Sequence, residues 1–277
     1  MTAAFLACRV SRPIRRFKFG FNRILRSLSS DSGSDRTSQD DADTTSTSCS
    51  MPLDIGFGAV NAFQMNQYAI TCTQTKQAVL IDCGASSQKE LDTFLEWITT
   101  RNYELKQVWQ THAHLDHVAG LGMLRTMYPN IPIWLHEKER GIYNSFDKRR
   151  KEFGFTVEGS GILPDEKSLE WFDKDSRPRN QMTLGNLTFD LFPCSGHSPG
   201  HVGFYELNSK AFFCGDFIMQ GSIGRTDFPT SSPTEMKASL KRFVELMEDD
   251  VVIYPGHGSP TTVQREKQHN PYLQEFL

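Results

Sequence analysis

The sequence contains no long apolar run, and its mean hydropathy is −0.45. A helix that crosses a bilayer needs about 20 consecutive apolar residues, so a spanning segment is excluded and no membrane partner is expected. The body of the chain also lacks a continuous basic patch, which disfavours a nucleic-acid partner. With 38% hydrophobic residues among 277, the chain can nevertheless bury a substantial core.

Motifs for a protein nucleophile are missing as well. No Gly-x-Ser-x-Gly elbow occurs, and none of the six cysteines stands in CxxC spacing or in a recognisable catalytic motif. Catalysis by a serine or cysteine nucleophile is therefore disfavoured. Four cysteines at or beside apparent strands are predicted to be reduced core residues: Cys72, Cys83, Cys194 and Cys214.

Acidic residues are absent from positions 1–30, where seven basic residues occur: Arg9, Arg12, Arg15, Arg16, Lys18, Arg23 and Arg26. Phe17, Phe21, Ile24 and Leu28 lie near one helical face of the same segment. This pattern is typical of an organellar transit peptide; its arginines favour the mitochondrion, with the plastid as the alternative. A nucleic-acid-binding arm is the weaker interpretation.

A second change in composition follows. The stretch up to Ser50 is rich in Ser, Thr and Asp and is predicted to be a disordered linker. The leader 1–50 holds 8 of the 30 basic and 5 of the 33 acidic residues, so 22 basic and 28 acidic residues remain in 51–277. This mildly acidic body implies no polyanionic partner. Its length of about 225 residues suits one α/β domain.

The most informative feature of the body is the run Thr-His-Ala-His-Leu-Asp-His at 111–117. Extended backbone would point His112 and His114 the same way. A turn into the following apolar stretch would direct Asp116 and His117 to a second position, so the motif is expected to serve two metals. Imidazole and carboxylate ligands suit zinc, iron or manganese. Solvated loop histidines are the alternative interpretation.

Three later strands deliver further ligand types. Each is followed by a glycine-bearing loop, and the loops present His197, Asp216 and His257 in that order. Taken singly, each of these residues would more often be an ordinary turn residue. Asp82, at the end of another apparent strand, is predicted to organise a loop near the site.

The order HxHxDH, H, D, H resembles the metallo-β-lactamase superfamily, and the resemblance covers essentially all of 51–277. Within it, the chain looks most like the short single-domain form of glyoxalase II, through the stretches THAHLDHVAGLG, SGHSPGHVGFYE, FCGDFIMQGSIGRTDFP and YPGHGSPTTVQREKQHNPYL. The resemblance implies that one metal is bound by His112, His114 and His197, and the other by Asp116, His117 and His257. Asp216 would bridge the two metals.

The implied reaction is hydrolysis of an activated acyl group, with a glutathione thioester such as S-D-lactoylglutathione as the expected small-molecule substrate. A divalent metal lowers the pKa of bound water far below that of bulk water, to near 7, so a hydroxide between two metals can attack without a protein nucleophile. Asp116 and Asp216 are the expected catalytic carboxylates. Two divalent ions per chain are expected, zinc first, with iron or manganese as alternatives.

Substrate recognition is less clearly encoded. Arg225 in the run GSIGRTDF falls where the resembling enzymes place a basic residue near the glutathione end, and it is predicted to bind a carboxylate. An incidental pair with Asp227 is the equally weighted alternative. Gly258 and Ser259 replace the aromatic residue expected after the last histidine, and no counterpart of the C-terminal helical domain of the long enzymes follows. An aromatic-rich, flap-like insertion at 141–181 is the predicted substitute, although its aromatics could instead anchor it to the body.

Three rival functions remain. A persulfide dioxygenase of the same superfamily would hold a single iron through His112, His197 or their neighbours and Asp216, and would act on glutathione persulfide. A non-catalytic binding protein would have no physical need for seven ligands. A nuclease of this fold would be expected to add a nucleic-acid-binding insertion. The hydrolase is therefore preferred.

The expected fold class is α/β, an αβ/βα sandwich of the metallo-β-lactamase type. One helix is predicted to begin at Ser87, where Glu90 completes a capping box. Another is predicted near Ser232, with Pro233 in its first turn. The oligomeric state does not follow from the residues.

Overall fold

The structure is a computed structural model that describes residues 52–172 and 181–277. The leader and linker predicted for 1–50 lie outside these residues, as do Cys8 and Cys49. Within the described ranges, none of the helices combines the length and the apolar character that crossing a bilayer requires.

Two six-stranded sheets form the body. The first has the strand order β1-β2-β3-β4-β5-β6. Its strands are β1 (Leu53–Val60), β2 (Met65–Cys72), β3 (Gln77–Ile81), β4 (Glu104–Trp109), β5 (Ile133–His136) and β6 (Glu170–Phe172). The second has the order β14-β13-β10-β9-β8-β7. Its strands are β7 (Gln181–Leu184), β8 (Leu187–Pro193), β9 (Val202–Glu206), β10 (Ala211–Gly215), β13 (Val252–Pro255) and β14 (Thr261–Thr262). A separate pair joins β11 (Ile218–Met219) to β12 (Ser222–Ile223).

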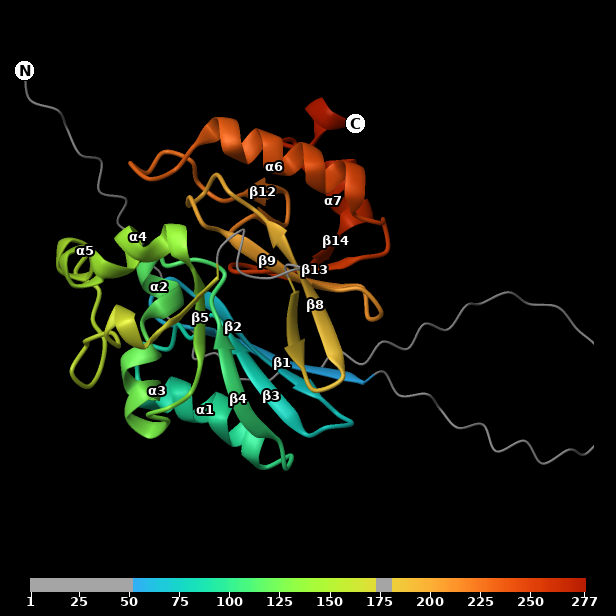
Figure 1. Cartoon of the computed structure of the whole chain (residues 1–277). Coiled ribbons are helices and arrows are strands. Elements are labelled where there is room, and N and C mark those ends of the chain that lie inside the picture. The colour runs from blue at the N-terminus through green and yellow to red at the C-terminus, as the bar shows by residue number, and fades with distance from the viewer. Residues whose placement is uncertain (1–51, 173–180) are drawn as a thin grey trace, which may run out of the picture.

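Helices cover the outer face of each sheet, which makes four layers (Figure 1). The first sheet is accompanied by α1 (Gln88–Thr99), α2 (Leu115–Val118), α3 (Leu121–Met127), α4 (Arg140–Asn144) and α5 (Phe146–Glu152). The second is accompanied by α6 (Pro233–Leu246) and α7 (Val263–His269). Short 3-10 turns lie at η1 (Glu137–Glu139), η2 (Glu166–Ser168) and η3 (Gln274–Phe276). The αβ/βα sandwich predicted from the sequence is confirmed.

Alternation along the strands builds this layering, because successive side chains point to opposite faces of a sheet. In β3, Val79 and Ile81 pack in the core between the sheets, whereas Leu80 packs under the helices. In β10, Phe213 joins the central core and Phe212 packs against α6. Each sheet is thus buried on both faces, as in other α/β sandwiches.

Both predicted helix starts are confirmed. The Ser87 side chain accepts a hydrogen bond from the main-chain N–H of Glu90, and the Glu90 side chain completes the capping box. Ser232 caps α6 in the same way, with Pro233 as its first residue. The four described cysteines, Cys72, Cys83, Cys194 and Cys214, are free and buried, as predicted.

Parallel strand pairing sets the position of the ligand loops. Strand β3 pairs in parallel with β4 and β4 with β5, with Ile81 opposite Trp109. In the other sheet β10 runs parallel to β13, with Gly215 opposite Pro255. Because the carboxyl ends of parallel strands meet at one edge, the loops that follow β3, β4, β10 and β13 lie side by side.

The 141–181 stretch is partly built into the sandwich. Strand β6 pairs with β5, and Phe172 lies in the core between the sheets. Phe146 and Phe155 are buried with the helices, so these three aromatics anchor the stretch to the body. Phe153 is 60% exposed instead. Residues 173–180 of the predicted insertion lie outside the described ranges.

Candidate metal centre

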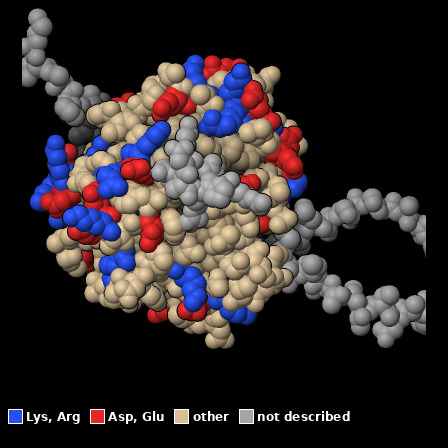
Figure 2. Space-filling model, viewed as in Figure 1, with Lys and Arg blue, Asp and Glu red and all other residues tan. Residues whose placement is uncertain are grey.

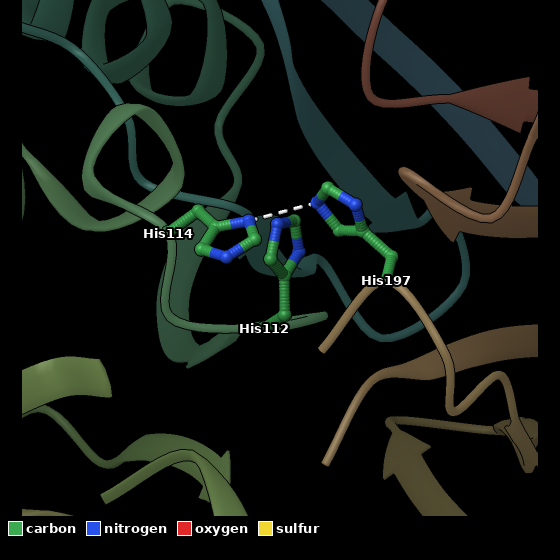
Figure 3. Close-up of side chains that lie close together, drawn as sticks. All are labelled: His112, His114 and His197. Atoms are coloured by element: carbon green, nitrogen blue, oxygen red, sulfur yellow. Dashed lines mark hydrogen bonds between the residues drawn. The ribbon is translucent and has the colours of Figure 1, made fainter. Parts of the chain in front are cut away.

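The first group of candidate ligands contains three imidazoles. His112 and His114 follow β4, and His197 lies between β8 and β9. The ring centroids of His112 and His114 are 4.7 Å apart, and Nδ1 of His114 lies 2.7 Å from Nε2 of His197. Figure 3 shows the three rings turned toward one another from two separate segments. One nitrogen from each ring lies within 4.8 Å of the others.

The second group combines one carboxylate and two imidazoles. Asp116 and His117 lie in the short helix α2, which is the predicted turn after His114, and His257 follows β13. Nε2 of His257 lies 3.2 Å from Oδ2 of Asp116. One atom from each of the three residues lies within 4.8 Å of the others.

Asp216 lies between the two groups. Its Oδ1 is 3.4 Å from Nε2 of His117, and its Oδ2 is 3.5 Å from Nε2 of His197. The same Oδ2 lies 3.5 Å from Nε2 of His257. All seven side chains singled out in the sequence therefore come together, with Asp216 in the position that a bridging ligand would need.

The donor set fits divalent cations. Among the described residues, Nε2 of His112, Nε2 of His117 and Oδ1 of Asp216 are buried without a hydrogen-bond partner. Buried polar atoms are normally satisfied, so several unpaired ligand atoms in one place point to an ion. Nitrogen and carboxylate donors without thiolates suit zinc, iron or manganese.

Asp82 and Thr111 orient two of the imidazoles. The Asp82 carboxylate accepts hydrogen bonds from the main-chain N–H of Thr111 at 2.7 Å and from its hydroxyl at 2.8 Å. Because that hydroxyl gives its only proton to Asp82, it must accept from Nδ1 of His112, 2.9 Å away. Nδ1 of His117 donates to Asp82 at 2.9 Å. Both hydrogen bonds place a proton on Nδ1, so Nε2 is the nitrogen that each ring in its neutral form would offer to a metal. Asp82 has the loop-organising role predicted for it.

A main-chain carbonyl group orients a third imidazole, that of His197. Nδ1 of His197 donates to the carbonyl oxygen of Arg225 at 2.8 Å. This bond directs Nε2 of His197 toward His114 and Asp216. The loop that contains Arg225 thus contributes to the site through its backbone.

The electrostatics favour neutral imidazoles in the first group. Burial, with neighbouring histidines, lowers the pKa of His112 well below its usual value and lowers that of His114 to about 3. Burial also lowers the pKa of His197, against the opposing effect of Asp216. Neutral rings are the form that binds metals.

In the second group, neighbouring carboxylates raise the pKa of a histidine. Burial alone would lower the pKa of His117, but Asp216, Asp116 and Asp82 outweigh it and hold that pKa well above its usual value. Burial would raise the pKa of Asp216, but His117 and other histidines hold it well below its usual value. Three carboxylates around one imidazole form a place that binds positive charge, which a divalent cation can supply.

Two glycines allow the ligand loops to approach one another. A Cβ added to Gly256 would lie 2.2 Å from Oδ1 of Asp216. Gly215 has a φ of 51°, and a Cβ there would lie 2.4 Å from Oγ1 of Thr111. A larger residue at either position would displace the loops that bring Asp216 and Thr111 into the site.

Two buried residues of the site were not singled out in the sequence. Glu139, fully buried at the end of η1, accepts hydrogen bonds from the main-chain N–H of Ala113 at 2.9 Å and of Gly200 at 2.6 Å. It therefore joins the His112–His114 loop to the loop that contains His197. His201 is buried, with its ring centroid 4.7 Å from that of His112. The HSPGH spacing could have indicated His201, whereas no local pattern indicates Glu139.

A cavity of about 380 Å³ opens over the ligands. Its floor includes His114, Asp116, His197, Asp216 and His257. Its walls are largely apolar and are formed by Phe63, Leu115, Phe153, Met219, Ile223 and Phe228. Arg149 and Arg225 are its two basic lining residues. Mostly apolar walls with a few convergent polar groups are usual for small-molecule sites.

Arg225 lies at this cavity as predicted, but its guanidinium is already paired. It donates to Oδ1 and Oδ2 of Asp227 at 2.9 and 2.8 Å and lies 4.5 Å from the ring centroid of Phe228. Both side chains of the ion pair are about two-thirds exposed. The structure thus contains the Asp227 pair that the sequence left as an alternative.

Known proteins resemble this chain over most of its described length. A family model described as the Metallo-beta-lactamase superfamily matches residues 60–257. The hydroxyacylglutathione hydrolase GloC of Haemophilus influenzae is 34% identical over 215 residues, covering 77% of this chain and 95% of that protein.

Two solved structures are similar in fold and sequence. The structure of TTHA1623 in a di-iron-bound form has a TM-score of 0.65 and 30% identity, covering 78% of this chain and 98% of that one. The BLEG-1 B3 metallo-beta-lactamase has a TM-score of 0.65 and 28% identity, covering 79% of this chain and 99% of that one.

Proposed function

This chain belongs to the metallo-beta-lactamase superfamily, and we propose that it hydrolyses a 2-hydroxyacylglutathione thioester, such as S-D-lactoylglutathione, to the hydroxy acid and glutathione. The observation that carries the proposal is the convergence of seven ligand-type side chains, five of which line the floor of one apolar-walled cavity. The similarity to GloC, which is named a hydroxyacylglutathione hydrolase, supports the choice of substrate.

Two divalent cations are the proposed cofactors, with zinc first and iron or manganese as alternatives. His112, His114 and His197 would hold one; Asp116, His117 and His257 would hold the other; Asp216 would contact both. When bound, such ions supply a water of lowered pKa and polarise the carbonyl under attack. The crystal structure of TTHA1623 is described as a di-iron-bound form, which supports the binding of two metals by this chain as well.

The chain's own residues prepare the site for this chemistry. Asp82 and Thr111 keep the proton of His112 and His117 on Nδ1. Asp116 and Asp216, the proposed catalytic carboxylates, have pKa values lowered by His117 against the effect of burial, so both are ionised at neutral pH. Preorganised charge of this kind needs little rearrangement during the reaction.

The cavity walls suit an acyl-thiol substrate. Phe63, Ile223 and Phe228 offer apolar surface beside the ligands, which excludes water from the reacting thioester. Arg225 is proposed to contact the thiol half of the substrate only after it leaves Asp227.

The test combines metal analysis of the purified protein with an assay on S-D-lactoylglutathione without oxygen. Thioester cleavage with two metals per chain is the expected result. No cleavage, together with one iron per chain and oxygen uptake with glutathione persulfide, would contradict the proposal and favour the persulfide dioxygenase.

Residues 1–50 are proposed to direct the protein to the mitochondrion, with the plastid as the alternative. The acid-free basic segment at 1–30 supports this proposal. Fusion of residues 1–50 to a fluorescent protein should bring the reporter into mitochondria, and a diffuse reporter would contradict the proposal.

A further inference from the structure

Helix α5 carries four consecutive basic residues, Lys148 to Lys151, and only one of them lacks a carboxylate partner among the residues that the structure describes. Lys148 pairs with Glu152 at 3.8 Å, and Arg150 and Lys151 both pair with Asp147 at 2.6 Å. In Figure 2, basic and acidic side chains are correspondingly mixed over the left side, where Figure 1 places α5. Among residues 52–172 and 181–277, no side chain forms an ion pair or hydrogen bond with the guanidinium of Arg149.

The unpaired residue is also the one that lines the cavity. Arg149 is partly buried, whereas the side chain of Lys148 is 77% exposed. Arg149 contributes to the same cavity as Phe63 and Phe153 and as the candidate ligands. Phe153, one helical turn further along, is a wall residue too, so one face of α5 and its C-terminal cap borders the cavity.

A partly buried guanidinium at a largely apolar cavity, with no ion-pair partner among the described residues, is placed to bind an anionic group. Arg150 and Lys151 lie in the last turn of α5 together with Arg149, so a favourable interaction with the helix dipole does not depend on Arg149 alone. Arg225, the other basic residue at the cavity, already has its partner in Asp227. A carboxylate of the substrate would be a suitable ion-pair partner for Arg149, since a planar guanidinium can donate two parallel hydrogen bonds to a carboxylate.

We propose that Arg149 is a specificity-determining residue that binds a carboxylate in the thiol half of the substrate. This inference rests on the proposed thioester hydrolysis. It adds the residue that selects a substrate whose thiol half carries a carboxylate over one whose thiol half is neutral. It assigns a recognition role to the 141–181 stretch, most of whose large aromatics instead anchor it to the body.

The experiment compares two thioesters with the same acyl group in the metal-loaded full-length protein. One is S-D-lactoylglutathione, whose thiol half has two carboxylates; the other is the D-lactoyl thioester of N-acetylcysteamine, whose thiol half has none. For Arg149→Ala, the ratio of kcat/KM for the first to that for the second should fall about 10- to 100-fold, as expected for the loss of a charged hydrogen bond. The loss should lie mainly in KM, and Arg149→Lys should recover part of it.

Lys148→Ala is the matched control, because it removes one positive charge from the same helix outside the cavity. Its substrate ratio should equal that of the wild type. If Arg149→Ala leaves the ratio unchanged, or if Lys148→Ala lowers it equally, the inference is wrong even though the hydrolase proposal stands.

A direct binding measurement separates this inference from the proposed function. If the wild-type protein cleaves neither thioester, the hydrolase proposal fails, and titration calorimetry with S-methylglutathione then decides the role of Arg149. Binding that Arg149→Ala weakens and Lys148→Ala preserves would support the recognition of a carboxylate. Absence of binding to the wild type, or equal binding to all three proteins, would overturn it.

Discussion

Oδ2 of Asp82 accepts a hydrogen bond from Nδ1 of His117 at 2.9 Å. Asp82 has a φ of 57°, an uncommon conformation for a residue other than glycine, and it is buried directly after β3. The strand end thus holds a carboxylate against the ring whose other nitrogen faces Asp216.

Asp82→Asn should therefore weaken metal binding. The two carboxylate oxygens accept from the Thr111 main-chain N–H on one side and from the Thr111 hydroxyl and His117 on the other. An amide has only one acceptor oxygen and cannot serve both sides, so the rings of His117 and His112 lose their fixed orientation. Loss of such outer contacts typically costs about 10- to 100-fold in metal affinity. Competition with a chromogenic chelator measures the metal affinity of the variant. Asp249→Asn, an exposed aspartate bonded to Lys267, is the control, and equal affinities in the two variants would contradict the prediction.

Removal of metal should lower both activity and stability. Binding to the native state alone stabilises it by about 2.7 kcal/mol at a ligand concentration of 100 times Kd. Dialysis against a chelator should lower Tm and abolish thioester cleavage, and addition of zinc, iron or manganese should restore both. A Tm that is insensitive to chelator would argue against metal binding at His112, His117 and Asp216.

Glu139→Ala should be among the most destabilising substitutions near the site. It leaves the buried N–H groups of Ala113 and Gly200 without their acceptor, at a cost of about 1–3 kcal/mol each. Urea denaturation should show a loss of about 2–5 kcal/mol. Glu137→Ala, in the same short η1 turn but 56% exposed, should change stability by less than about 0.5 kcal/mol. Similar values for the two variants would refute the bridging role.

Glu139 should also give stability a defined pH dependence. Burial raises the pKa of its carboxyl above the ordinary value of 4.5, although the hydrogen bonds from Ala113 and Gly200 oppose the shift. The native state then binds more protons than the unfolded state above pH 4.5, so the contribution of Glu139 is fully present below that pH and is lost as pH rises through the native pKa. In chelator, the free energy of unfolding of the wild type relative to Glu139→Gln should fall across this window. A difference in the free energy of unfolding that stays constant with pH would contradict the raised pKa of Glu139.

Arg225→Ala should affect recognition less than Arg149→Ala does. Arg225 is about two-thirds exposed, and an exposed charge pair contributes at most about 1 kcal/mol. Loss of such a contact with the substrate should raise KM for the glutathione thioester no more than about fivefold. If Arg225 contacts substrate after leaving Asp227, Asp227→Asn should lower KM by freeing the guanidinium. A larger rise in KM for Arg225→Ala than for Arg149→Ala would reverse the proposed order of the two arginines.

The main elements and candidate ligands could be predicted because they leave local patterns. Val79, Leu80 and Ile81 form a buried strand pattern, and Ser87 with Glu90 forms a capping box. Element ends were less predictable: the insertion predicted at 141–181 includes β6 and the first residue of β7, since tertiary pairing with β5 and β8 sets where these strands lie. Roles that depend on partners distant in the chain could not be predicted.

The sequence by itself determined the layered α/β fold and the set of seven ligand-type residues, because period-two alternation and the dense run at 111–117 are local properties. The tertiary structure alone decided that Glu139 bridges two ligand loops, since its partner Gly200 is 61 residues away and only the packing of both sheets brings them together. It likewise decided that Arg225 is paired, while Arg149, at the same cavity, has no ion-pair partner within the described ranges. A basic residue looks the same in a sequence whether its carboxylate partner belongs to its own chain or to a ligand.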